Sequence, residues 1–211
     1  MAKVIALTGS KGGTGKTSLS HLLGHGAGSL PRAIPAVVIT TDPEDEVLQD
    51  ERRYLVVDGR TPKQLADELE RLLPVERLLI IVDGAAARPD LDALVSEIAD
   101  VVLVPFGPSA QEAARAAKNL EMMPRAVGLP NRWPTHPGVA KRAKRWLEAL
   151  PAKRRLPPFK AIPRLDGLVA SEGYQDLAYD VAAPARGLIL EVLSLAKVDP
   201  SDLAAVATSS R

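Results

Sequence analysis

Short runs of consecutive apolar residues alternate along the chain with segments of helical spacing. The clearest runs cover residues 4–7, 36–39, 54–57, 78–82 and 101–104. A run that is apolar at every position, and not at every second one, is typical of a strand buried on both faces of a parallel sheet. The pattern therefore predicts an α/β protein with a doubly wound, mostly parallel sheet flanked by helices.

Helices are predicted between these runs. Leu19, Leu22 and Leu23 recur at helical spacing, and the glycines and prolines over residues 24–35 are expected to end that helix and form a loop. Capping boxes predict helix starts at residues 61 and 109, and a last helix is expected over about 184–197. The helix that starts at residue 109 has a small-residue face, which permits either core packing or close contact with a partner. That face comprises Ala110, Ala113, Ala114 and Ala117.

Length and composition favour one domain over residues 1–197, followed by a short tail over 198–211. The 211 residues are 46% hydrophobic but only 3% aromatic, as expected of helices packed on a parallel sheet. The absence of cysteine excludes disulfides, thiolate metal sites and cysteine nucleophiles. No run resembles a signal peptide or membrane span, and the tail is not a basic amphipathic helix, so we expect a cytoplasmic protein without a membrane role.

The most specific motif is S-K-G-G-T-G-K-T-S, residues 10–18, between the first predicted strand and the first helix. Its glycines let the backbone approach an anion, and the helix start adds the positive end of its dipole. Lys16 supplies a cation for the β- and γ-phosphates, and the Thr17 hydroxyl is suited to Mg²⁺. The predicted phosphate-binding residues are Lys11, Gly12, Gly13, Thr14, Gly15, Lys16, Thr17 and Ser18.

This segment departs from the general P-loop at Ser10, where a glycine is usual, and fits the narrower form K-G-G-x-G-K-T-[ST]. It resembles the deviant Walker A motif of the ParA/MinD family of dimerising ATPases, and most closely the short, ParF-like partition ATPases. The resemblance extends from Lys3 to about Lys197. It implies a P-loop NTPase fold, ATP and Mg²⁺ as cofactors, and an ATP-dependent homodimer. Lys11 would reach the partner's nucleotide and offset the repulsion between two triphosphates.

Two aspartates at strand ends compete for the Walker B role, which is to hold the water shell of Mg²⁺. Asp58 follows the run 54–57, and Asp83 follows the longer and more apolar run 78–82. The run 78–82 is the better candidate for a central strand, and the family's A-D-x-V-L-I-P segment has a counterpart at residues 99–105. We therefore predict Asp83 as the magnesium residue and Asp58 as a strand-end residue, and leave open whether Asp58 lies near the site.

Asp42 follows another buried run, at the sheet edge where ligands bind in open α/β sheets. The family has a D-x-D-P-Q-like segment here, of which Asp42-Pro43 is retained while Thr40 and Glu44 differ. The resemblance implies that Asp42 helps to position the attacking water and the magnesium shell. It also implies that Lys11 and Lys16 take part in catalysis. The alternative is that Asp42 only starts a turn before the proline. By the same resemblance, Pro163 and Arg164 border the adenine pocket, in a last short strand over residues 161–164.

A basic segment covers residues 131–164, with ten lysines and arginines against one acid, Glu148. An apolar stripe from Val139 to Leu150 is expected to anchor one helix whose other side is basic. The outer side suits non-specific contact with DNA phosphates, although a solvated face is the plainer interpretation. The candidate DNA-binding residues are Lys141, Arg142, Lys144, Arg145, Lys153, Arg154 and Arg155.

The favoured function is a partition or positioning ATPase that segregates plasmid or chromosome DNA on the nucleoid. No general base or arginine finger is evident, which predicts slow intrinsic hydrolysis stimulated by a partner, for which a small ParB-like centromere-binding or adaptor protein is expected. Two alternatives stay open. The same ATPase could position a protein cargo such as a chemoreceptor array, a microcompartment or division machinery, or the chain could be a P-loop metabolic ligase or kinase of the same superfamily.

Overall fold

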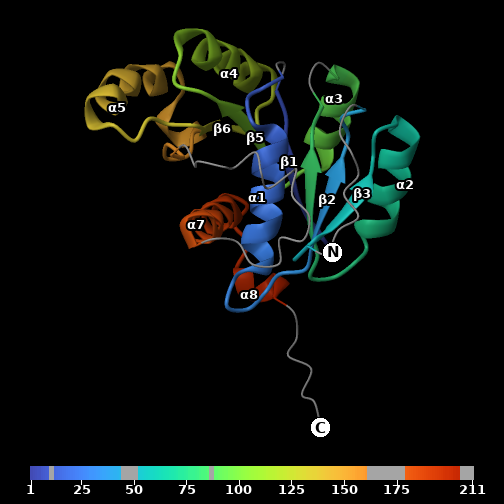
Figure 1. Ribbon diagram of the computed structural model, residues 1–211. Coiled ribbons are helices and arrows are strands. Elements are labelled where there is room, and N and C mark those ends of the chain that lie inside the picture. Colours follow the sequence, from blue (N-terminus) through green and yellow to red (C-terminus); the bar gives the residue numbers. More distant parts are fainter. Residues whose placement is uncertain (10–11, 44–51, 86–87, 161–178, 205–211) are drawn as a thin grey trace.

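Six strands in the described residues form one parallel sheet (Figure 1). The computed structural model describes residues 1–9, 12–43, 52–85, 88–160 and 179–204. The strand order is β3-β2-β4-β1-β5-β6, and every pairing is parallel, which confirms the predicted fold class. The strands are β1 (Lys3–Leu7), β2 (Ala36–Thr40), β3 (Leu55–Asp58), β4 (Leu79–Asp83), β5 (Val101–Phe106) and β6 (Ala126–Pro130).

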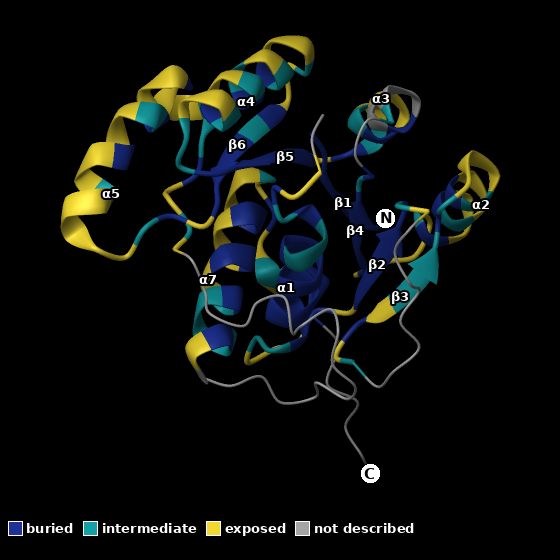
Figure 2. Ribbon diagram, turned by 45° about the horizontal axis from the view of Figure 1, so that its top comes forward, coloured by how far each residue is buried: buried dark blue, intermediate teal, exposed yellow. Residues whose placement is uncertain are grey.

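Helices cover both faces of this sheet. On one face lie α1 (Lys16–Gly28), α7 (Tyr179–Leu195) and α8 (Pro200–Leu203); on the other lie α2 (Pro62–Leu72), α3 (Pro89–Ile98) and α4 (Ala110–Met122). The residues of β1 are apolar at successive positions because both faces of the strand are buried. Ile5 and Leu7 pack in the core beneath α1 and α7, and Val4 and Ala6 pack in the core beneath α2, α3 and α4. Figure 2 shows the central strands buried and the outer helix faces exposed.

Helix α1 runs through Gly28, so the expectation that its glycines end the helix at residue 24 is wrong. The glycines are sites of close packing. A Cβ on Gly24 would lie 2.8 Å from the Tyr54 ring, and one on Gly26 would lie 2.4 Å from the Ala185 carbonyl of α7. A helical glycine costs roughly 1 kcal/mol relative to alanine. Burial of Leu22 and Leu23, both 0% exposed, contributes roughly 2 kcal/mol each and outweighs that cost.

Two further elements differ from the expectation. Strand β6 was not predicted, because Gly128 and Pro130 interrupt its apolar run. A Cβ on Gly128 would lie 2.4 Å from the Leu150 side chain. The single helix expected over residues 139–150 is instead α5 (Pro137–Ala143) followed by the 3₁₀ helix η1 (Lys144–Ala149). As a result Val139 is exposed, while Leu147 and Leu150 are buried.

The C-terminal region packs more extensively than expected. Helix α7 starts at Tyr179, five residues before Pro184, which lies inside it. Val198 and Leu203, in the segment expected to be a tail, belong to the core. The strand expected over residues 161–164 lies outside the described residues. Among the described helices, none has the length and hydropathy needed to cross a membrane.

Candidate nucleotide-binding site

The loop after β1 has the geometry of a phosphate cradle. Gly13 and Gly15 have φ of 74° and 89°, which glycine adopts without strain. Space beside Gly13 is open, since an added Cβ would meet nothing within 4 Å. Helix α1 starts directly at Lys16, and Gly15 at its N-cap offers no side-chain hydrogen bond. A glycine at the N-cap lets the backbone at the helix start approach an anion closely.

Lys16 lies at the base of this loop and is only 7% exposed. Thr14 is buried, Thr17 and Ser18 are half-buried, and Gly12 is exposed at the rim. The predicted phosphate-binding residues from Gly12 to Ser18 therefore follow one continuous turn from the solvent to the start of α1. The remaining one, Lys11, lies outside the described residues, as do Pro163 and Arg164.

Asn131 holds the loop in place from the far end of the sheet, and the sequence analysis missed it. The residue directly follows β6 and is 2% exposed. Its side-chain Nδ2 donates to the Thr14 carbonyl at 2.9 Å. A Cβ on Gly15 would lie 2.6 Å from the same Nδ2. Gly15 is therefore required both by its positive φ and by this contact.

Asp83 lies at the carboxyl end of β4, beside the end of β1, where it pairs in register with Leu7. It is 1% exposed, and Ser20 of α1 donates from Oγ to its Oδ1 at 3.1 Å. The same Oγ lies 3.0 Å from the Lys16 carbonyl oxygen, so its single proton is shared between the carboxylate and the carbonyl. One hydroxyl thus links the Asp83 carboxylate to the first turn of α1.

Asp42 lies two residues after β2, which pairs with β4 on the side opposite β1. Thr41 fixes this strand end, because its Oγ1 donates to the Asp83 carbonyl at 2.7 Å and accepts from the Ala85 N–H at 2.9 Å. Asp42 is half-buried one residue further on. Within the described residues no three His, Cys, Asp or Glu side chains converge on a metal site.

Asp58 has different surroundings, at the end of the edge strand β3. The Arg60 guanidinium binds it with two hydrogen bonds, of 3.0 and 2.8 Å, and Gln64 of α2 adds a third at 3.0 Å. These contacts are local and join β3 to the start of α2. Asp58 therefore stabilises the connection between the edge strand β3 and α2, whereas Asp83 is bonded to α1.

Asp58→Asn is expected to lower the melting temperature at neutral pH by about 1–3 °C, since partly exposed ion pairs contribute little. Hydrogen bonds from Arg60 lower the pKa of Asp58 to about 2. The unfolded pKa is about 3.9, so the stabilisation is complete above that pH and is lost as the pH falls toward 2. Thermal melts of both proteins should therefore converge over this window. Asp67→Asn, at an exposed carboxylate of α2, is the control; a constant gap down to pH 2 would contradict the assignment.

The basic segment divides into two groups. Lys141, Arg142, Lys144, Arg145 and Lys153 are exposed on α5, η1 and η2 (Ala152–Arg154). Arg154 instead donates to the carbonyls of Leu120, Met123 and Ala126, at 2.7–3.2 Å. Arg155 donates to the carbonyls of Leu147 and Leu150. The Arg154 guanidinium thus holds the segment to α4 and β6, while that of Arg155 binds the end of η1 within the segment. The sequence pattern did not reveal either role.

The fold is that of MinD/ParA-type ATPases. MinD cell division protein of Aquifex aeolicus is 16% identical, with a TM-score of 0.67, covering 91% of this chain and 97% of that one. A putative plasmid partition protein from Borrelia burgdorferi bound to AMPPNP is 14% identical (TM-score 0.65; 92% and 99% covered). Cobyrinic acid a,c-diamide synthase from Mycobacterium smegmatis, with bound ADP and magnesium, is 14% identical (TM-score 0.58; 99% and 100% covered). No protein-family model and no curated protein matches the sequence.

Proposed function

We propose that this protein is a Mg²⁺-dependent ATPase that dimerises with ATP, binds DNA without sequence preference and releases it after partner-stimulated hydrolysis. The observation that carries the proposal is the cradle itself. An open glycine-rich turn at the end of β1, a nearly buried Lys16 and the Ser20–Asp83 hydrogen bond lie at one edge of the sheet. The plasmid partition and MinD proteins share the fold over nearly their whole length.

The cradle fits ATP and Mg²⁺. Lys16 would bind the β- and γ-phosphates, and the Thr17 hydroxyl would bind Mg²⁺ directly. Asp83 would hold the water shell of the metal, and Asp42, one residue beyond Thr41, would act on the attacking water and on the same shell. When bound, Mg²⁺ neutralises charge that develops on the phosphates during hydrolysis. In the dimer, Lys11 would contact the partner's phosphates, and Pro163 and Arg164 would border the adenine.

DNA binding is assigned to the five exposed cations of the basic segment: Lys141, Arg142, Lys144, Arg145 and Lys153. They lie on the elements after β6, at the edge of the sheet. The guanidinium of Arg145 stacks on the Trp146 ring at 4.2 Å, which restrains it at the surface. Arg154 and Arg155 are left out, because their guanidinium groups already bind backbone carbonyls. The proposed partner is a small DNA-binding or adaptor protein.

Retention on DNA with ATP, with ADP and without nucleotide tests this function. We expect retention with ATP alone and a linear decrease of log affinity with log salt. Replacing Lys141, Arg142, Lys144 and Arg145 with alanine should flatten that slope by about 0.9 for each lost phosphate contact. The control replaces three exposed cations elsewhere, Lys63, Lys118 and Arg125. Equal retention in all three nucleotide states would refute the nucleotide dependence of DNA binding. An unchanged slope in the fourfold variant would refute the assignment of phosphate contacts to these four residues.

A metabolic ligase is the second candidate, and the fold shared with the cobyrinic acid a,c-diamide synthase favours it. Both candidates require ATP and Mg²⁺, so the cradle does not separate them. ATP turnover separates them, because a ligase is stimulated by a small acceptor molecule and a partition ATPase by DNA or a protein partner.

A further inference from the structure

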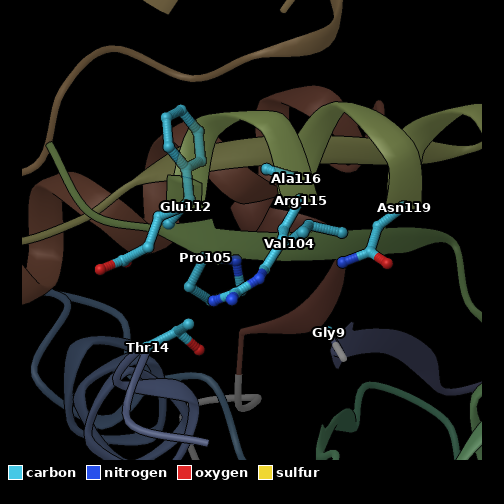
Figure 3. A pocket seen from close by; sticks show the side chains of 9 residues that line it. Gly9, Thr14, Val104, Pro105, Glu112, Arg115, Ala116 and Asn119 are labelled. Carbon is cyan, nitrogen blue, oxygen red and sulfur yellow. The ribbon is translucent and has the colours of Figure 1, made fainter. Parts of the chain in front are cut away.

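A small pocket lies between the phosphate-binding loop and α4 (Figure 3). Gly9 and Thr14, at the two ends of the loop, form one wall. The opposite wall comes from α4 and the end of β5. Lys16 and Asp83 do not line this pocket, and Thr14 is the residue that it shares with the predicted phosphate-binding set. The residues of the opposite wall are Val104, Pro105, Phe106, Glu112, Arg115, Ala116 and Asn119.

Two polar atoms on the facing walls lack a hydrogen-bond partner in the described part of the structure. They are Nη1 of Arg115 and Oγ1 of Thr14, and both are buried. In Figure 3 the Arg115 guanidinium extends from α4 toward Thr14. A buried donor of a charged group is costly when it is left unsatisfied. An anionic oxygen between the two walls would satisfy both atoms, because a hydroxyl can donate as well as a guanidinium.

The acid that lines this pocket, Glu112, is engaged elsewhere. Its carboxylate accepts from the Gly107 N–H at 2.6 Å and lies 3.6 Å from Nη2 of Arg132. These two contacts offset its negative charge at the start of α4. The Arg115 side of the pocket therefore keeps the positive potential that an anionic oxygen requires.

We infer that Arg115 is a phosphate-binding residue that acts within its own chain, on the terminal phosphate of the nucleotide held by the loop. This inference rests on the proposed ATP binding. The guanidinium would contact a γ-phosphate oxygen, and the Thr14 hydroxyl would share that oxygen or an adjacent one. ATP offers this contact and ADP does not, so α4 senses the terminal phosphate. A guanidinium at this place also stabilises charge on the transferred phosphoryl group.

The test compares dissociation constants for AMPPNP and ADP, with Mg²⁺, by isothermal titration calorimetry. Arg115→Met keeps the packing of the side chain and removes its charge. We expect the preference for AMPPNP over ADP to fall by about tenfold or more, the size of a charge-assisted hydrogen bond. Thr14→Val should reduce it in the same direction by less. Lys118→Met, at an exposed position on the same helix, should leave the ratio unchanged.

An unchanged ratio in a folded Arg115→Met protein would overturn the inference while the proposed function stands. If that variant does not fold, Arg115→Gln, a neutral polar replacement, takes its place with the same criterion. Failure of the wild-type protein to bind either nucleotide would overturn the proposed function itself, and the wild-type titration alone reveals that outcome.

Discussion

Lys16→Ala is expected to lower the affinity for ATP roughly 30-fold or more, with the fold retained. Lys16 is 7% exposed at the base of the cradle, so its contact with phosphate would be shielded from water. Truncating one member of a buried, hydrogen-bonded charge pair costs about 2–5 kcal/mol of binding free energy. Titration calorimetry with ATP and Mg²⁺ measures the change directly.

The control for this variant is Lys63→Ala, which removes an exposed lysine from α2. It should bind ATP as the wild-type protein does. Thermal melts of Lys16→Ala without nucleotide separate a change in stability from the loss of phosphate contact. Wild-type affinity in a folded Lys16→Ala protein would mean that the glycine-rich loop is not the ATP site.

The sequence predicted those parts of the site that depend on local pattern. Residues 12–18 form the cradle because a buried strand, glycines and a helix start follow one another directly, and each has its own signal. The choice of Asp83 over Asp58 depended on the longer apolar run. In the structure the longer run is the central strand: β4 lies between β2 and β1 and is buried throughout, whereas β3 is the edge strand and is largely half-buried or exposed. The magnesium role of Asp83 stays a prediction.

The parts that the sequence did not reveal depend on contacts between distant segments. Asn131 bonds to Thr14 across 117 positions, and no local pattern marks it. Glycines within a helical pattern indicate the end of a helix, but in α1 Gly26 allows the backbone of α7 to pack closely against it. Arg154 looks like any other cation of the basic segment until its carbonyl acceptors are known. In each case packing between elements overrides the local preference of the residue.

These distant contacts give the loop support on two sides. Asn131 holds it from β6, and the pocket with Arg115 lies between it and α4. Since α4 packs on β5 and β6, movement of the loop on nucleotide binding would be passed to the helix and to the edge of the sheet that carries the basic segment. The proposed nucleotide dependence of DNA binding therefore has a continuous path of contacts in the described structure.

Gly15→Ala is expected to abolish nucleotide binding and to lower stability. Two costs combine at this position. A residue with a side chain at φ 89° is strained by roughly 1–2 kcal/mol. In addition, the new Cβ would lie 2.6 Å from Nδ2 of Asn131, so the loop or the asparagine must move. Thermal melts and ATP titration of the same preparation measure both effects.

Two further variants separate the backbone strain at Gly15 from the collision of the new Cβ with Asn131. Gly187→Ala, in α7, meets nothing within 4 Å and should raise the melting temperature, because alanine favours a helix by roughly 1 kcal/mol. Adding Asn131→Ala to Gly15→Ala removes the collision but not the φ strain. The double variant should then lose less stability than the sum of the two single losses. Strict additivity would show that the Cβ at position 15 does not collide with Asn131.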